Sequence, residues 1–405
     1  MRILILYHSN IIPQRPGADE HIYTTAKLLS EYHSVTVLTW GPGTSKVFND
    51  ANLTVIHQGW NKDKIVSASY NKIPQFVVDI VAYLGIYYIF FLRKAKGPSF
   101  GKFNRLELGK FDIALRVSFD SNKILKHLKK YSDTKLIELA LVGGLPHYVK
   151  NLKEWLAYTN SFPPISIKIL NAMYRIMQKV VFSFYISTLS SRDVIVISKH
   201  DEQILKMASG LRVKYLPPIH DFNPESSESD RNDTVLFFSG KSMAARIAVE
   251  YIVHIAQKLP EINFSITGLS GNDLKNDIIP PNVKLHGYIG DDQFHRLLKN
   301  SAIVVMPLIS GSGFQTKLAE ALSKGKPVIT TSVIANEFPG ITNGEHVLIE
   351  DDPTEFFKKI ELLINDRDLR EKLMRNALEY YKRNLRSEVA LDQTLGYLSE
   401  LMHRE

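Results

Sequence analysis

The sequence predicts a two-domain α/β protein in which strands and helices alternate. Its length of 405 residues exceeds what one ordinary hydrophobic core accommodates. Residues 2–39 read as an apolar strand, a helix and a second strand, and residues 303–331 repeat that order with a glycine-rich loop after the first strand. Because such βαβ units build parallel sheets, we expect a Rossmann-like domain in each half of the chain.

The composition is that of a globular protein, with 44% hydrophobic and 23% charged residues. The chain has no cysteine, which excludes disulfide bonds and thiolate metal sites. The net charge of +8 fits anionic small molecules, anionic lipid surfaces or nucleic acid as partners. Nucleic acid is the least favoured of these, because the sequence has no zinc-finger spacing, RNA-binding aromatic motif or Walker loop.

The first half contains a series of short apolar runs that predict strands. After the first βαβ unit they lie at residues 53–57, 111–117, 136–142 and 194–198. The first unit lacks G-x-G-x-x-G, so a dinucleotide is not indicated. Its opening strand at residues 2–6 is too short for a signal peptide, which predicts a cytoplasmic protein.

Two longer apolar runs raise the question of membrane attachment. Residues 76–92 are strongly apolar and are followed by a basic cluster at 93–96, but the run is short for a membrane span and contains Asp79. Residues 165–187 form a second long helical pattern that carries basic side chains. The alternatives are two core helices or, together with the net charge, peripheral attachment to an anionic membrane surface.

The most informative stretch is the strand, loop, helix and strand of residues 303–331. Residues 310–313 form a loop without bulky side chains, and Gly325 is a suitable residue to end the helix. Backbone amides of such a loop and of the first helical turn favour an anion, for which a diphosphate is the natural occupant. Lys317 adds positive charge, and the Glu320 carboxylate suits paired ribose hydroxyls. An ordinary tight turn is the alternative.

Residues 311–328 read G-S-G-F-x-x-K-x-x-E-A-L-x-x-G-x-P-V. This pattern resembles the donor-site signature of the retaining group 1 glycosyltransferases, whose fold is called GT-B. In that family a Glu usually opens the motif eight residues before the second Glu, whereas here Ser312 holds the first position and Glu320 the second. The resemblance implies an α/β protein of GT-B type, with two Rossmann-like domains facing across a cleft.

The expected domains are residues 1–222 on the acceptor side and residues 234–385 on the nucleotide-sugar side. The polar segment 223–233 reads as the linker between them. By the same resemblance, a final helix at residues 386–405 packs back on the first domain.

The resemblance also assigns residues to the donor. The family's basic pair after the first strand of the second domain corresponds to Lys241 and Arg246, with the two residue types swapped. The ribose would be bound by Glu320, and the base by the loop that contains Tyr288 and Ile289. The other expected contacts to the diphosphate are Gly17, Gly313, Phe314, Gln315, Thr316 and Lys317.

The first domain offers weaker signals. Residues 16–23 (P-G-A-D-E-H-I-Y) resemble the family's first glycine loop, usually G-G-A-E, although a simple helix entry is the alternative. Relatives often carry a His or carboxylate of this domain near the anomeric carbon. Asp120 and His147 follow predicted strands, where open α/β sheets bind ligands, so both are candidate catalytic residues.

The reaction implied is transfer of a hexosyl group to an acceptor hydroxyl, with retention and without a metal or other cofactor. No D-x-D motif appears where a metal would need one, and the aspartate pairs at residues 291–292 and 351–352 read as solvated turn residues. The expected acceptor is lipid-linked or a glycan. A sugar-nucleotide epimerase of the same fold and a non-catalytic nucleotide-sugar binding protein are the alternatives.

Overall fold

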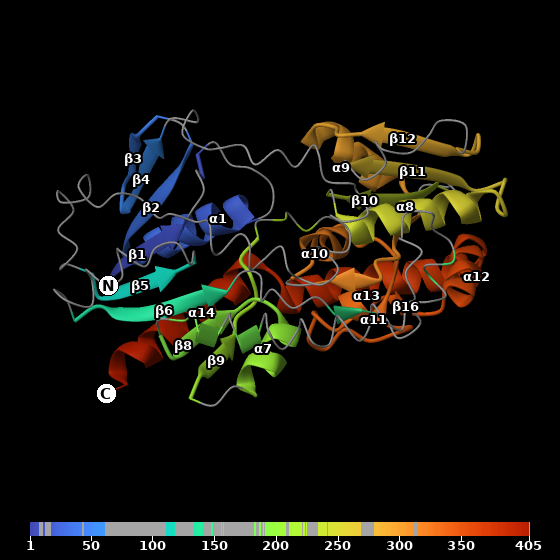
Figure 1. Ribbon diagram of the computed structural model, residues 1–405. Helices are drawn as coiled ribbons and strands as arrows, with labels where there is room; N and C mark the ends of the chain where they lie inside the picture. The colour runs from blue at the N-terminus through green and yellow to red at the C-terminus, as the bar shows by residue number, and fades with distance from the viewer. Residues whose placement is uncertain are drawn as a thin grey trace.

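The computed structural model describes residues 1–7, 11–12, 18–42, 44–60, 111–117, 133–140, 147–148, 155, 157, 182–183, 186–187, 189, 191–207, 210–220, 222, 224, 234–240, 242–268, 279–311 and 314–404. In this part of the chain, two α/β units lie side by side, as Figure 1 shows. The first unit contains a sheet of eight strands and the second a sheet of six. The α/β fold class expected from the sequence is therefore confirmed.

The first sheet is built from β1 (Arg2–Tyr7), β2 (Ser34–Pro42), β3 (Lys46–Asp50), β4 (Leu53–Trp60), β5 (Ile113–Arg116), β6 (Lys135–Ala140), β8 (Asp193–Val196) and β9 (Arg212–Tyr215). The strand order is β3-β4-β2-β1-β5-β6-β8-β9. All neighbours are parallel except β3 and β4, which are antiparallel. The apolar runs correctly predicted the inner strands, whereas the two edge strands β3 and β9 were not predicted.

Helix α1 (Ala18–Ser30) covers one face of this sheet. Its side chains at helical spacing, Ile22, Ala26 and Leu29, are fully buried in one hydrophobic cluster with β1 and β2. The expected strand–helix–strand start of the chain is confirmed by this packing.

The last helix, α14 (Ser387–His403), lies against the same face of the first sheet. Leu398 is fully buried in the cluster that contains Ile3 and Ile5 of β1. The Lys135 side chain at the start of β6 donates a hydrogen bond of 2.7 Å to the carbonyl of Leu401, near the end of the helix. The chain thus returns to the first unit after completing the second (Figure 1).

The second sheet contains β10 (Thr234–Ser239), β11 (Asn263–Gly268), β12 (Val283–Gly287), β13 (Ile303–Met306), β15 (Val328–Thr330) and β16 (Leu348–Ile349). Its order is β12-β11-β10-β13-β15-β16, and every neighbouring pair is parallel. Starting from β10, the chain builds one side of the sheet and then returns to build the other from β13. This is the doubly wound order of a Rossmann-like domain.

The helices of the second unit are α8 (Met243–Ala256), α9 (Asp291–Asn300), α10 (Thr316–Ser323), α11 (Ser332–Ala335), α12 (Pro353–Asn365) and α13 (Arg367–Asn384). Helix α10 lies where the sequence predicted it. It is followed by Gly325, which has a φ of +60° that a side-chain-bearing residue rarely adopts.

The two aspartate pairs, expected as solvated turn residues, both lie at helix starts, and Asp291 and Asp292 are exposed as expected. Asp291 and Asp292 form the first turn of α9, where acidic side chains are favourable for the helix dipole. Asp352 is the N-cap of α12, and its side chain accepts hydrogen bonds from the amides of Thr354 and Glu355. Asp residues favour turns and helix starts alike, so the sequence pattern alone did not separate the two.

The apolar run 76–92, most of the run 165–187 and residues 225–233 of the linker lie outside the described residues. Within the described part of the chain, no helix combines the length and the apolar character that crossing a bilayer requires.

The docking of α14 gives the first prediction. Replacing the fully buried Leu398 by Ala should lower the free energy of unfolding by about 2–5 kcal/mol, because the substitution leaves a cavity between the helix and the first sheet. Urea denaturation measures this change. Gln393→Ala, at an exposed position of the same helix, is the matched control and should change stability by less than about 0.5 kcal/mol. Equal effects of the two substitutions would contradict the docked helix.

Candidate functional site

The glycine loop and α8 lie where the second sheet reverses its strand order. The loop follows β13 and α8 follows β10, and these two strands are direct neighbours. After β10 the chain continues toward one edge of the sheet, and after β13 it continues toward the other edge. The carboxyl ends of these two strands therefore flank the position at which open α/β sheets bind ligands. Two chain segments that the sequence assigned to a diphosphate therefore follow adjacent strands of the sheet.

Helix α10 begins directly after the glycine loop, and its first turn has no side-chain cap. Gln315 is the N-cap residue, and its side chain makes no capping hydrogen bond. The amides of Leu318 and Ala319 donate to the Gln315 carbonyl and start the helical ladder. The turn before them offers backbone donors and the positive end of the dipole to an anion. Of the loop itself, Ser312 and Gly313 lie outside the described residues.

The Glu320 carboxylate lies on α10 among charged groups from three elements. Oε1 of Glu320 is 3.8 Å from Nε2 of His295 on α9. Burial raises the pKa of Glu320 to about 7, with Lys317 opposing the shift and Glu20 of α1 adding to it. Burial lowers the pKa of Lys317, and the charge of Glu320 opposes that shift. The carboxylate is therefore close to its titration point unless a ligand stabilises the charge.

Arg246 lies near the start of α8 and has a partner within the helix. Its Nε is 3.5 Å from Oε1 of Glu250. A cation near a helix start opposes the helix dipole, and Glu250 supplies a compensating negative charge one helical turn away. A bound diphosphate would compete with Glu250 for the guanidinium group. The second expected cation, Lys241, lies outside the described residues.

The candidate base-binding residues follow β12 and precede α9. The Tyr288 side chain is 71% exposed, and Ile289 is half-buried. The exposed Tyr288 ring is accessible to a base. Base binding by both residues remains a prediction.

Of the first-domain candidates, the structure places the backbone of His147. The short strand β7 (His147–Tyr148) pairs in antiparallel fashion with β14 (Ser310–Gly311) in the glycine loop. His147 lies opposite Gly311, so a segment that follows β6 of the first sheet reaches the loop of the second unit. Asp120 and Gly17 lie outside the described residues.

A family model described as "Glycosyl transferases group 1" matches residues 233–366. The match covers the β10–α8 unit, the glycine loop and Glu320. The second unit is a group 1 glycosyltransferase domain.

Solved structures similar to the whole chain show the GT-B fold. Sucrose-phosphate synthase from Thermosynechococcus elongatus has a TM-score of 0.64 at 13% identity, and the match covers 99% of both chains. TarM has a TM-score of 0.65 at 11% identity, covering 100% of this chain and 99% of TarM. HepE from Anabaena, in complex with UDP and glucose, has a TM-score of 0.61 at 15% identity, covering 99% and 100%. No curated protein matches the sequence significantly.

Two buried histidines connect the first domain to the glycine loop of the glycosyltransferase domain. His21 of α1 and His220 lie with ring centroids 5.6 Å apart, and His220 stacks on Phe314 at 5.8 Å. Burial lowers the pKa of His21 to about 4 and that of His220 to about 3. Burial therefore favours the neutral form of both rings: His21 forms a hydrogen bond of 3.2 Å with the carbonyl of Ile219, and His220 packs against aromatic rings.

A buried carboxylate of the glycosyltransferase domain lies at the start of α7 (Lys199–Lys206) of the first domain. Oε2 of Glu337 accepts a hydrogen bond of 2.9 Å from the amide of Lys199. Burial raises the pKa of Glu337 to about 7, opposed by hydrogen bonds from Ser198 and from the amides of Lys199 and His200, whereas the charge of Asp201 adds to the shift. A titratable group thus lies at a contact between the two units.

The sequence analysis missed several of these groups. His295 and Glu20 meet Glu320 only because helices far apart in the sequence face it, and no local pattern reports that. One further interaction that was missed, between Arg116 and Glu138, did leave a signal in the sequence. Arg116 and Glu138 are charged residues within apolar strands, and they form a buried ion pair of 2.9 Å at paired positions of β5 and β6.

The environment of Glu320 gives the second prediction. If Glu320 binds the ribose, Glu320→Gln should weaken binding of a nucleoside diphosphate by roughly 1.5–3 kcal/mol, the scale of a hydrogen bond to a charged group. Ribose hydroxyls that donate to the carboxylate would lower its pKa in the complex below the value of about 7 in the free protein. Affinity of the unmutated protein should therefore rise from about pH 6 to about pH 8.

Isothermal titration calorimetry at several pH values measures both effects. The Gln variant is the matched control, since its affinity should vary less with pH. Equal affinity and equal pH dependence of the two proteins would remove Glu320 from the site.

The Glu337 contact gives the third prediction. Because the pKa of Glu337 is raised on folding from 4.5 to about 7, the protonated carboxyl stabilises the folded state. This contribution to the free energy of unfolding is complete below the unfolded pKa and is lost as the pH rises through about 7. The unmutated protein should lose about 2 kcal/mol more stability between about pH 5 and about pH 8 than Glu337→Gln. Denaturant melts at the two pH values test this difference, and parallel pH profiles of the two proteins would contradict it.

Proposed function

We propose that the protein transfers a hexosyl group from a nucleoside diphosphate sugar to an acceptor hydroxyl, with retention and without a metal ion. One observation carries the proposal: the glycine loop, α10 and Glu320 lie at the switch point of a group 1 glycosyltransferase domain. A nucleoside diphosphate matches this arrangement, with the diphosphate at the first turn of α10 and the ribose at Glu320.

Uridine diphosphate is the nucleotide that we propose for the donor. HepE from Anabaena has the same fold and was solved with UDP and glucose and with UDP-glucose. A further structure of this fold, from E. coli, was solved with UDP-2-fluoro glucose. In this chain the base would lie against Tyr288 and Ile289.

Stabilisation of the leaving group is the main chemical task in this proposal. Breaking the bond between the anomeric carbon and the diphosphate oxygen leaves negative charge on the diphosphate. The amides at the start of α10 oppose that charge, and so do the side chains of Arg246, Lys241 and Lys317. Fixed donors in a partly buried site need no reorganisation when the bond breaks, which favours the transition state.

The acceptor would approach from the first domain. Strand β7 brings the backbone of His147 to the glycine loop, which supports His147 as a group near the reacting sugar. Asp120 is the second candidate, since it follows β5. A glycan or a lipid-linked molecule is the proposed acceptor, and TarM from S. aureus was solved with alpha-GlcNAc-glycerol and UDP.

Peripheral attachment to an anionic membrane is a further part of the proposal. It rests on the apolar run 76–92 with the basic cluster at 93–96, on the basic amphipathic run 165–187 and on the net charge of +8. Flotation with anionic and neutral vesicles tests it: binding to anionic vesicles that is lost in high salt supports attachment, and no binding at low salt rejects it.

The fourth prediction concerns the reaction. With UDP-glucose the protein should release UDP slowly, release it faster when a suitable acceptor is added, and give an α-linked product. Chelation by EDTA should leave the rate unchanged, because amides and cations meet the diphosphate charge. Coupled UDP detection and proton NMR of the product measure these outcomes.

Other results would support the alternatives. Loss of activity with EDTA and its return with Mg²⁺ would contradict metal independence. Formation of an epimer of the donor would indicate an epimerase. Tight UDP-glucose binding without turnover over a panel of acceptors would indicate a binding protein.

A further inference from the structure

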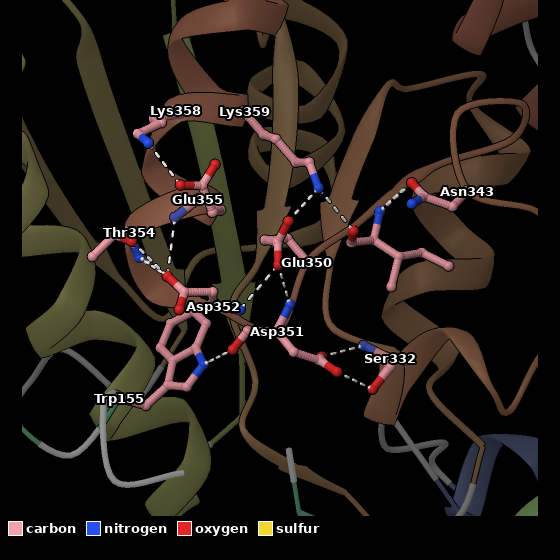
Figure 2. A network of polar contacts seen from close by, with 11 residues as sticks. Trp155, Ser332, Asn343, Glu350, Asp351, Asp352, Thr354, Glu355, Lys358 and Lys359 are labelled. Carbon is pink, nitrogen blue, oxygen red and sulfur yellow. Dashed lines mark hydrogen bonds and ion pairs between the residues drawn. The ribbon is translucent and has the colours of Figure 1, made fainter. Parts of the chain in front are cut away.

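A residue from the first half of the chain lies in the core of the glycosyltransferase domain. Trp155 is fully buried and belongs to the hydrophobic cluster of that domain. Its ring packs edge-on against Tyr251 of α8 and Phe356 of α12, with centroids 4.6 and 5.6 Å away. The indole Nε1 donates a hydrogen bond of 2.6 Å to the carbonyl of Asp351 (Figure 2).

The same part of the chain contacts this domain a second time, at the glycine loop. The chain leaves the first sheet at Ala140, and by His147 it is paired with Gly311. A two-residue strand pair contributes little stability alone, because few hydrogen bonds oppose the entropy of ordering the chain. Among the residues that the structure describes, Trp155 is the next along the chain after Tyr148, and it is fully buried.

The two attachments are connected through α11. The Asp351 carboxylate accepts hydrogen bonds from the amide and hydroxyl of Ser332 at the start of α11, at 2.8 and 2.6 Å (Figure 2). Helix α11 in turn packs closely on the glycine loop. A Cβ added at Gly311 would lie 3.3 Å from Cγ1 of Val333 and 3.4 Å from Cδ1 of Ile334. Direct contacts therefore lead from Trp155 to Gly311.

The turn that receives the indole is itself held in place. Oε1 of Glu350 accepts hydrogen bonds from the amides of Asp351 and Asp352, at 2.9 and 3.0 Å. The other oxygen of Glu350 pairs with Lys359 of α12 (Figure 2). The carbonyl that Trp155 contacts is thus a fixed acceptor rather than part of a loosely held loop.

We infer that Trp155 is a positioning residue that anchors its part of the chain on the glycosyltransferase domain and keeps β7 paired with the glycine loop. In this arrangement β7 moves together with the glycine loop, and the backbone of His147 stays beside Gly311. Its importance for glycosyl transfer rests on the proposed function, but the contacts and their test do not. The competing interpretation is that Trp155 is an ordinary core residue.

Hydrogen–deuterium exchange of the full chain tests this inference without any substrate. Trp155→Phe keeps an aromatic ring but removes the Nε1 donor. Amides in the peptides that contain residues 147–148 and 310–311 should then exchange about fivefold faster, the factor expected for loss of one buried hydrogen bond. Trp155→Tyr, a second variant that keeps the aromatic packing, should show the same direction of change.

Tyr251→Phe is the matched control. It removes a buried hydrogen bond of 2.5 Å to the carbonyl of Pro353 in the same aromatic cluster, but it leaves the ring against Trp155 and the indole hydrogen bond in place. It should lower the melting temperature while leaving exchange at residues 310–311 unchanged.

Unchanged exchange in both Trp155 variants, or equal acceleration in Tyr251→Phe, would overturn the inference and leave Trp155 as a core residue. Failure of the proposed function is distinguishable. A protein without transferase activity that still shows the selective change in exchange would retain the positioning role and lose only the proposed reaction.

Discussion

The first turn of α10 is the feature on which the rest of the site depends. Its N-cap residue, Gln315, makes no side-chain cap, and it lies at the switch point of the sheet, where connections to the two sides diverge. The backbone amides of this turn favour an anion. The other candidate ligand-binding side chains are arranged around it. Glu320 follows on the same helix. Arg246 lies in the first turn of α8, the helix that follows the neighbouring strand β10.

The first domain contributes to this site through contacts with the glycosyltransferase domain. His220 stacks on Phe314, Glu20 influences the titration of Glu320, and β7 pairs with Gly311. Each contact joins a segment of the first domain to the glycine loop or to α10. Segments of both domains therefore contact this part of the chain, as the proposed transfer between two substrates requires.

The sequence predicted the elements that have a strong local pattern. Buried parallel strands are continuous apolar runs, and the glycine loop before α10 has a motif of its own. Strand β3 was missed because all its residues are exposed, which removes the apolar pattern. The contact of His295 with Glu320 and the burial of Trp155 depend on tertiary packing alone. A local pattern does not record which distant helix will face a side chain.

A crystal structure of the protein soaked with UDP tests the central claim most directly. The account predicts diphosphate oxygens within hydrogen-bond distance of the amides at the start of α10, and ribose hydroxyls on the Glu320 carboxylate. It also predicts that Arg246 turns from Glu250 toward the diphosphate. Density for the nucleotide at the carboxyl edge of the first sheet, with the start of α10 empty, would contradict the account.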